Sequence, residues 1–461
     1  MAGEPAACVD TTKSVHDVRA RVARVVATAI ALVLLAHALA VLSPLRVNFD
    51  SVLLLEMVEN HLAGRGWNPD MRSQHPVLYP MIVRALHAFG LAGPAGLVPL
   101  NVLMLAVGLW MFDRVLARAF SALPGGAPAR RVILLLTALS WVVVKHAALV
   151  VTDVVFFGLA AAAILAMERA ASAPWSARPA WTGRGGWLSL GAALAVACVL
   201  TRTVGIALLP GLAWAALGGA PGLSAGARFL SRRPFFGVGV LSVAAVSAGA
   251  GAWVLTRTSY WAGLRDEVQG LSLLEIAARI AGFRLSDLGQ TLLNVPESVV
   301  PAPARGVLIA AGLVGAALVL VGLWNARARL APTHVVLLAY AAILLAWPFA
   351  DPRFLLPVLP ILGALVVESL RPLWMIRAGA VLAWAYVIVF SALGCGALAL
   401  SLRLTFAGPR FPDLYGSGVY ADSYRAAMGQ PHDPTRVDPL VVRLLRRFDP
   451  AHAPGGTPDT Q

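Results

Sequence analysis

The sequence predicts an all-α fold, a polytopic transmembrane helical bundle. Hydrophobic residues make up 59% of its 461 positions and charged residues only 13%, whereas about a quarter of a soluble domain is charged. Apolar runs recur along the whole chain at the length that crosses a hydrocarbon core, and helices satisfy their own backbone hydrogen bonds there. A barrel would show short strands of alternating polarity instead. We therefore expect about eleven membrane-spanning helices.

The spans follow from the apolar runs and from the polar residues that separate them. Two connections, 44–93 and 257–304, are long, and the others are short. The predicted spans cover residues 25–43, 94–116, 131–149, 153–168, 187–200, 204–218, 235–256, 305–324, 333–349, 354–370 and 378–402.

The N-terminal leader, residues 1–24, carries four lysine or arginine residues immediately before the first apolar run. Positive charge marks the cytoplasmic side of a span, so we expect a cytoplasmic N-terminus. The apolar run is about 18 residues long and lacks a small-residue cleavage site, which favours a retained helix over a removed signal peptide.

With this orientation, every short inner connection is rich in arginine. The bias accounts for the net charge of +14 through anionic lipid at the inner membrane surface, so we expect membrane lipid as a partner and no nucleic acid. The inner connections contain Arg114, Arg118, Arg130 and Arg131, then Arg169, Arg178 and Arg184, then Arg228, Arg232 and Arg233, then Arg327 and Arg329, and finally Arg371 and Arg377.

The stretch 187–218 is predicted as two short helices separated at Arg202. A single helix would bury this arginine near the middle of the membrane at a cost of a few kcal/mol. It would also reverse the orientation of every later connection.

The first outer loop is predicted to form interfacial helices. Asp50 is placed to cap a helix that ends near Ala63, with Glu56 and Glu59 on its solvated face, and a second segment covers 77–90. The outer loop 257–304 also has the pattern of interfacial helices. We divide the chain into a cytoplasmic leader (1–24), a transmembrane domain (25–402) and a partly disordered extracytoplasmic tail (403–461).

Polar residues from distant parts of the sequence fall on the predicted outer face. Ionisable groups near a membrane are costly, so several on one face indicate a functional site. Each also has a simpler explanation: a helix cap, a turn, a lipid-phosphate contact or an interfacial anchor. The residues are Asp50, His75 and Tyr79, then Lys145, His146 and Asp153, then Arg202, and then Asp351 and Arg353.

Six short segments together resemble the GT-C superfamily of integral-membrane glycosyltransferases. The resemblance is to the branch of the dolichyl-phosphate-mannose-protein mannosyltransferases and the lipid A aminoarabinose transferase, over roughly residues 25–370. Phe354 stands where many relatives have tyrosine. The segments are Asn48-Phe49-Asp50, His61-Leu62-Ala63-Gly64-Arg65-Gly66, His75-Pro76-Val77-Leu78-Tyr79-Pro80, Thr152-Asp153, Leu200-Thr201-Arg202-Thr203-Val204-Gly205 and Asp351-Pro352-Arg353-Phe354-Leu355-Leu356-Pro357-Val358-Leu359-Pro360.

The resemblance implies transfer of a single sugar from a polyprenyl-phosphate donor to an extracytoplasmic glycan, lipid or protein by inverting displacement. It also implies a bacterial inner-membrane location. Asp50 would be the general base, assisted by Asp153 and His75. The donor phosphate and sugar would be bound by Arg202, Arg353, Tyr79, Lys145 and Asp351. No cofactor is required on this reading, although a divalent metal remains possible.

Two other functions remain open at this stage. A secondary transporter or lipid flippase would also be polytopic, although such proteins usually contain paired halves with broken helices. A GT-C-like assembly subunit without catalytic activity would keep the fold and lose the reaction.

Overall fold

The computed structural model describes residues 11–67, 76–173, 183–218, 269–347, 349–374, 376–416 and 418–453. Within these ranges the secondary structure is helical, apart from one isolated backbone bridge between Arg46 and Leu149. Seven of the described helices are long and apolar enough to cross a membrane, or eight if one bent pair counts as a single span. The predicted all-α class is confirmed, and the chain is an integral membrane protein.

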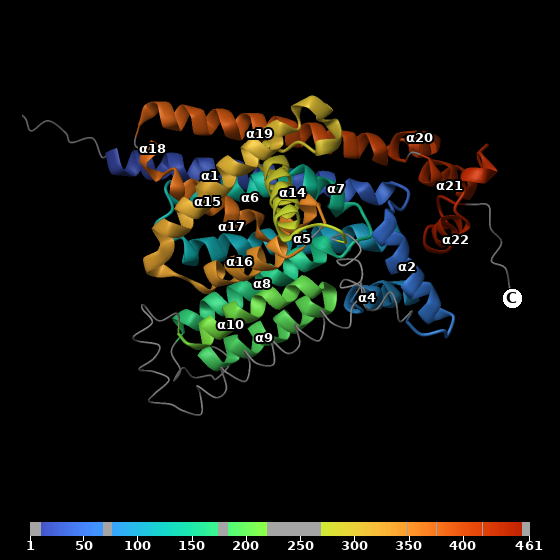
Figure 1. Ribbon diagram of the computed structural model, residues 1–461, viewed down its shortest axis with the longest axis horizontal. Coiled ribbons are helices and arrows are strands. Elements are labelled where there is room, and N and C mark those ends of the chain that lie inside the picture. Colours follow the sequence, from blue (N-terminus) through green and yellow to red (C-terminus); the bar gives the residue numbers. More distant parts are fainter. Residues whose placement is uncertain are drawn as a thin grey trace, which may run out of the picture.

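The helices that build the bundle and its outer cover are named as in Figure 1. They are α1 (Thr11–Ala38), α2 (Phe49–Leu62), α4 (Leu78–Ala88), α5 (Pro94–Ala119), α6 (Gly126–Leu139), α7 (Trp141–Ala147), α8 (Asp153–Ser172), α9 (Arg184–Thr201), η3 (Thr203–Ala207), α10 (Leu208–Ala216), α14 (Leu273–Leu293), α15 (Gly306–Ala326), α16 (Pro332–Leu345), η7 (Pro352–Val358), α17 (Leu359–Ser369), α19 (Arg377–Thr405), α20 (Phe411–Tyr415), α21 (Val419–Ala427) and α22 (Pro439–Phe448).

Ten of the eleven predicted spans fall on described residues, and each coincides with helical structure; the span predicted at 235–256 lies outside the described residues. The separation of 187–218 into two helices is confirmed. Helix α9 ends at Thr201 and η3 begins at Thr203, so Arg202 occupies the break.

The segment predicted as one span at 131–149 is not a single straight helix, because the chain bends by 56° between α6 and α7. Asn294, the αL residue that ends α14, satisfies the backbone groups exposed by the bend. Its side-chain oxygen accepts from the Trp141 amide at 2.7 Å, and its side-chain nitrogen donates to the Leu139 carbonyl at 3.3 Å. The Asn294 side chain therefore stabilises a bend between α6 and α7 that the apolar sequence of this segment does not predict.

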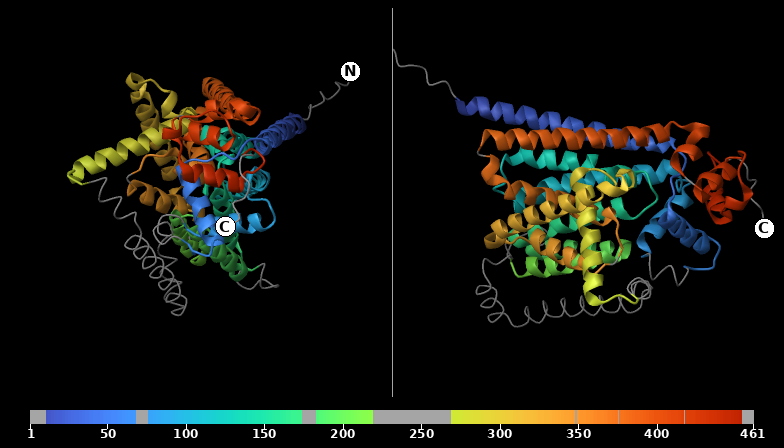
Figure 2. Two further views of the ribbon diagram at one scale, coloured as in Figure 1. Left: turned by 90° about the vertical axis from the view of Figure 1, so that its right-hand side faces the viewer. Right: turned by 45° about the horizontal axis from the view of Figure 1, so that its top comes forward.

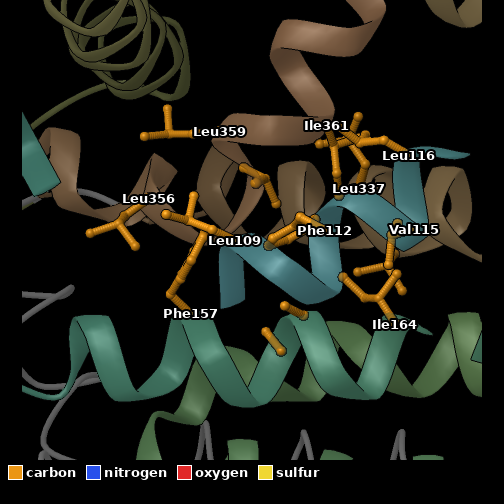
Figure 3. Close-up of a cluster of buried hydrophobic side chains, with 14 of the residues drawn as sticks. Leu109, Phe112, Val115, Leu116, Phe157, Ile164, Leu337, Leu356, Leu359 and Ile361 are labelled. Atoms are coloured by element: carbon orange, nitrogen blue, oxygen red, sulfur yellow. The ribbon is translucent and has the colours of Figure 1, made fainter. Parts of the chain in front are cut away.

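The long helices run side by side, with α8 at the centre of the bundle between α5 and α9 (Figures 1 and 2). The apolar core joins α5 and α8 to α16, η7 and α17 (Figure 3). Phe112 and Phe157 lie in this core with ring centroids 5.2 Å apart, and both side chains are buried. Close packing around α8 fixes the end of the helix that carries Asp153.

The arginine-rich connections meet at one end of the bundle, which we call the inner end. Arg118 donates to the Ser172 hydroxyl at 3.2 Å, and Arg371 donates to the Ala122 carbonyl at 2.7 Å. Arg131 donates to the Ala23 carbonyl at 2.8 Å. Helices α2, α4 and α20–α22 lie at the opposite, outer end (Figure 1). The predicted division of the connections into two faces is therefore present in the described structure.

The outer end has its own apolar core, formed by α2, α4 and the C-terminal helices α20, α21 and α22. The tail is helical and packed as far as Phe448, because α22 places its apolar face on α2. The expected disorder concerned mainly the residues after Asp449, most of which lie outside the described residues. One expectation is corrected here. Glu59 does not face solvent; it is 4% exposed and pairs with Arg443 of α22 at 3.1 Å.

Helix α14 crosses the bundle steeply (Figure 2) and contacts α15 through two glycines. A methyl group on Gly289 would overlap the Leu308 carbonyl oxygen, and one on Gly312 would overlap the Leu285 carbonyl oxygen. Small residues at such a crossing allow the two backbones to approach closely. This crossing positions the polar residues of α14 that face the outer end.

We predict that Gly289→Ala lowers the free energy of unfolding by about 1–3 kcal/mol, because the added methyl group forces α14 and α15 apart. Gly282→Ala is the matched control, since a methyl group at this position of the same helix meets no atom within 4 Å. Unfolding of both variants in detergent measures the difference. Equal stability of the two variants would contradict the close crossing.

Candidate active site

Asp50 lies in the first turn of α2 and is not the residue that caps it. The cap is Asn48, whose side-chain oxygen accepts from the Ser51 amide at 2.9 Å. This corrects the expectation that Asp50 caps the helix. The Asp50 carboxylate instead forms an ion pair with Arg353, which is 303 residues away in sequence.

Arg353 is held in place by the turn that it occupies. Asp351 precedes η7, and one of its carboxylate oxygens accepts from the Arg353 amide at 3.0 Å while the other lies 2.8 Å from Arg353 Nε. One guanidinium group therefore lies between two carboxylates. The side chains of Arg353 and Asp50 are 17% and 23% exposed, so the pair lies at the edge of the bundle and not in its interior.

A second ion pair joins Arg202 to Asp153. Asp153 is the first residue of α8 and its side chain is 2% exposed, while the Arg202 side chain is 15% exposed. Since Arg202 occupies the break between α9 and η3, its extended backbone carries the side chain toward the start of α8. The break that was predicted from membrane energetics also positions this cation.

Phe354 lies among three guanidinium groups. The guanidinium carbons of Arg202, Arg353 and Arg284 are 5.3, 5.5 and 6.0 Å from the centre of its ring. An aromatic face attracts cations, so the ring favours this gathering of positive charge. The Tyr340 hydroxyl donates to the Phe354 carbonyl at 2.7 Å and fixes the backbone beneath the ring.

Arg284 and Asp287 of α14 belong to this cluster, although sequence analysis did not select them. Arg284 pairs with Asp287 at 2.7 Å and also donates to the carbonyls of Trp347 and Phe349. The sequence did contain a sign of this pair, because Arg284 and Asp287 are opposite charges three positions apart, a spacing that places them side by side on a helix. Burial raises the pKa of Asp287 to about 7, although the neighbouring Arg284 guanidinium partly offsets this effect.

The other predicted site residues are placed differently. Lys145 is exposed on α7, and the neighbouring His146 is buried with its ring nitrogen 2.7 Å from the Val142 carbonyl. Tyr79 is fully buried in the core between α2 and the C-terminal helices, so its place beside a sugar stays a prediction. His75 lies outside the described residues.

The cluster combines two chemical capacities. Its guanidinium groups match the geometry of a phosphate, and its carboxylates accept protons. Among the described residues, no group of three or more histidine, cysteine, aspartate or glutamate side chains is arranged to hold a metal ion.

An apolar cavity of about 630 Å³ lies between α6, α14, α15, α17 and α19. It extends from Pro124 at the inner end to Ser140 at the bend between α6 and α7. On α14 its lining includes Leu288, the residue after Asp287. The cavity therefore runs along the bundle between these helices and reaches the bend between α6 and α7.

No protein-family model matches this chain, and neither does any curated protein. Among solved structures, the chain is similar to ArnT from Cupriavidus metallidurans bound to undecaprenyl phosphate, with 17% identity and a TM-score of 0.44 over 92% of this chain and 77% of that one. It is also similar to the oligosaccharyltransferase of Archaeoglobus fulgidus, with 14% identity and a TM-score of 0.48 over 86% of this chain and 55% of that one.

We predict that Arg202→Ala lowers the free energy of unfolding by about 3–5 kcal/mol, because it leaves the buried Asp153 carboxylate without its charge partner. The double variant Asp153→Asn/Arg202→Gln should lose less unfolding free energy than the sum of the losses in the single variants Asp153→Asn and Arg202→Gln. The more exposed pair of Arg130 and Asp113 is the control, with an expected coupling of about 0.2–1 kcal/mol. Additive losses at Asp153 and Arg202 would contradict this pairing.

We also predict a pH effect from Asp287. Its pKa in the folded chain is about 7, whereas an unfolded aspartate titrates near pH 4. Between these values the folded chain holds a proton that the unfolded chain releases, so stability falls as pH rises. Asp287→Asn should remove a slope of up to about 1.4 kcal/mol per pH unit. Unfolding from pH 4 to 8 measures it, and an unchanged slope would contradict the raised pKa.

Proposed function

We propose that this protein is a GT-C-type membrane glycosyltransferase. It transfers one sugar from a polyprenyl-phosphate donor to an extracytoplasmic glycan, lipid or protein. The observation that carries this proposal is the pairing of Asp50 with Arg353, beside the pairing of Asp153 with Arg202. Both pairs join segments on which the sequence resembles that superfamily.

The reaction is a direct displacement at the anomeric carbon. The acceptor oxygen or nitrogen attacks this carbon, the bond from carbon to phosphate oxygen breaks, and polyprenyl phosphate leaves. Asp50 takes the proton from the acceptor as general base. Arg202 and Arg353 bind the phosphate and stabilise the negative charge that develops as it leaves.

The ion pair between Asp50 and Arg353 suggests how binding of the sugar donor makes Asp50 available as general base. In the structure Arg353 is shared by Asp50 and Asp351. A donor phosphate that binds Arg353 competes with Asp50 for the guanidinium group and so frees the Asp50 carboxylate to accept a proton. Asp153 keeps Arg202 oriented from the other side of the cluster.

The supporting residues and the cavity fit a lipid-linked donor. In this proposal Asp351, which precedes η7, and Lys145 of α7 assist in binding the donor phosphate, while His75 orients the acceptor and Tyr79 of α4 flanks the sugar. The apolar cavity that ends near α14 has the lining expected for part of an isoprenoid chain. From the arginine bias of the inner end we place the site on the extracytoplasmic side, with a cytoplasmic N-terminus. The bacterial inner membrane is what the resemblance to the superfamily implies.

The test is transfer from a panel of radiolabelled undecaprenyl-phosphate monosaccharides to envelope membranes of a deletion strain, catalysed by the purified, reconstituted chain. We expect Asp50→Asn to lower the rate by about a hundredfold or more, as for loss of a general base. Asp113→Asn is the matched control, because this aspartate lies at the inner end and pairs with Arg130.

Three results would contradict the proposal. One is an unchanged rate in Asp50→Asn. Another is transport of the labelled lipid or sugar across proteoliposomes without a glycosyl product, which would identify a transporter or flippase. The third is full complementation of the deletion strain by Asp50→Asn, as expected of a non-catalytic subunit.

A further inference from the structure

The short segment Leu45–Val47, which leads into α2, is held by side chains from the C-terminal helices. The Tyr424 hydroxyl of α21 accepts from the Val47 amide at 3.0 Å and donates to the Leu45 carbonyl at 2.5 Å. The Tyr415 hydroxyl of α20 donates to the Val47 carbonyl at 2.9 Å. We call these contacts the tyrosine clamp.

Two charged side chains complete the hold on this segment. Asp449, just after α22, accepts from the Leu45 amide at 2.7 Å. The Arg46 side chain is 4% exposed and donates to the Ser401 hydroxyl and the Thr405 hydroxyl of α19, both at 2.8 Å. Backbone and side chain of the segment are therefore fixed by residues about 350 to 400 positions later.

The clamped segment also connects the two candidate catalytic carboxylates. Arg46 forms the isolated parallel bridge with Leu149, and its carbonyl accepts from the Val150 amide at 3.4 Å. Asp50 follows the bridge by four residues on one side, and Asp153 follows it by four on the other. A displacement of Leu45–Val47 therefore moves Asp50 relative to Asp153.

The same C-terminal helices approach Asp50 itself. Tyr420 of α21 lies within electrostatic range of Asp438 and Asp50, which add to the effect of burial in raising the pKa of its hydroxyl. Tyr424 is 1% exposed and packs edge-on against Phe411, with ring centroids 5.1 Å apart. Its ring is anchored in the outer core, so its hydroxyl has a fixed position.

We propose that Tyr424 is a positioning residue for Asp50 and that it acts through the backbone of Leu45–Val47. Tyr415 and Asp449 assist it. The proposal rests on the proposed function, in which Asp50 must meet an acceptor and a donor in one geometry. Small displacements of a catalytic group lower the rate of the chemical step strongly while leaving substrate binding intact.

The test compares Tyr424→Phe with Ser423→Ala in the full chain. Tyr424→Phe keeps the buried ring and removes only the hydroxyl of the clamp. Ser423→Ala is a matched control from the adjacent position. The Ser423 hydroxyl is fully buried and makes two hydrogen bonds, to Val419 and from Asp438, and neither involves the clamped segment.

The first measurement is amide hydrogen exchange at Val47, Ser51 and Val52. We expect Tyr424→Phe to speed exchange there by about tenfold, equivalent to about 1.4 kcal/mol for the lost hydrogen bonds. Ser423→Ala should leave these amides at the wild-type rate. Unchanged exchange in Tyr424→Phe would overturn the proposal.

The second measurement is steady-state transfer from the undecaprenyl-phosphate monosaccharide that the wild type uses. We expect kcat to fall by about tenfold or more in Tyr424→Phe while KM for the donor is unchanged. Faster exchange with an unchanged kcat, or an equal loss in Ser423→Ala, would overturn the positioning role. If the wild type transfers no sugar, the proposed function fails, and exchange at Ser51 and Val52 still decides whether Tyr424 orders the Asp50 turn.

Discussion

The ion pair between Arg353 and Asp50 is the contact on which the candidate active site depends. A charge at the edge of an apolar bundle needs an opposite charge or a hydrogen-bonding partner, because its loss of water is costly. Arg353 meets this need with Asp50 from α2 and Asp351 from its own turn. Arg202 and Asp153 follow the same rule. Charge pairing thus fixes how these loops meet at the candidate site.

The apolar core makes these pairs possible by fixing the helix ends that carry them. Helix α8 is almost completely buried between α5 and α9, so Asp153 has a fixed place at its start. The close crossing of α14 and α15 brings Arg284 to the ring of Phe354. The apolar core therefore fixes the position of the backbone, and the charge pairs then determine the orientation of the side chains.

The C-terminal helices give the outer end a second source of order. They share an apolar core with α2 and α4, and their polar groups bind the backbone just before Asp50. Glu59 and Arg443 join the same two parts of the chain through charge. A candidate catalytic carboxylate near the N-terminus is consequently positioned by residues from the last part of the sequence. A change that loosens the C-terminal helices is therefore expected to alter the position of Asp50 as well.

Hydropathy and charge, which are local properties, were enough to predict the fold class, the position of most helices on described residues, the two faces of the bundle and the break at Arg202. They also selected Asp50, Asp153, Arg202, Asp351 and Arg353, which the structure brings into two neighbouring ion-paired groups. Only the tertiary structure identified Asn48 as the cap of α2, the bend at Ser140, the inclusion of Arg284 and Asp287, and the packed tail with Glu59 inside it. Each of these depends on a partner distant in sequence or on burial by another helix. The charge of a residue is written in the sequence, but its partner is decided by which helix ends the packed core brings together.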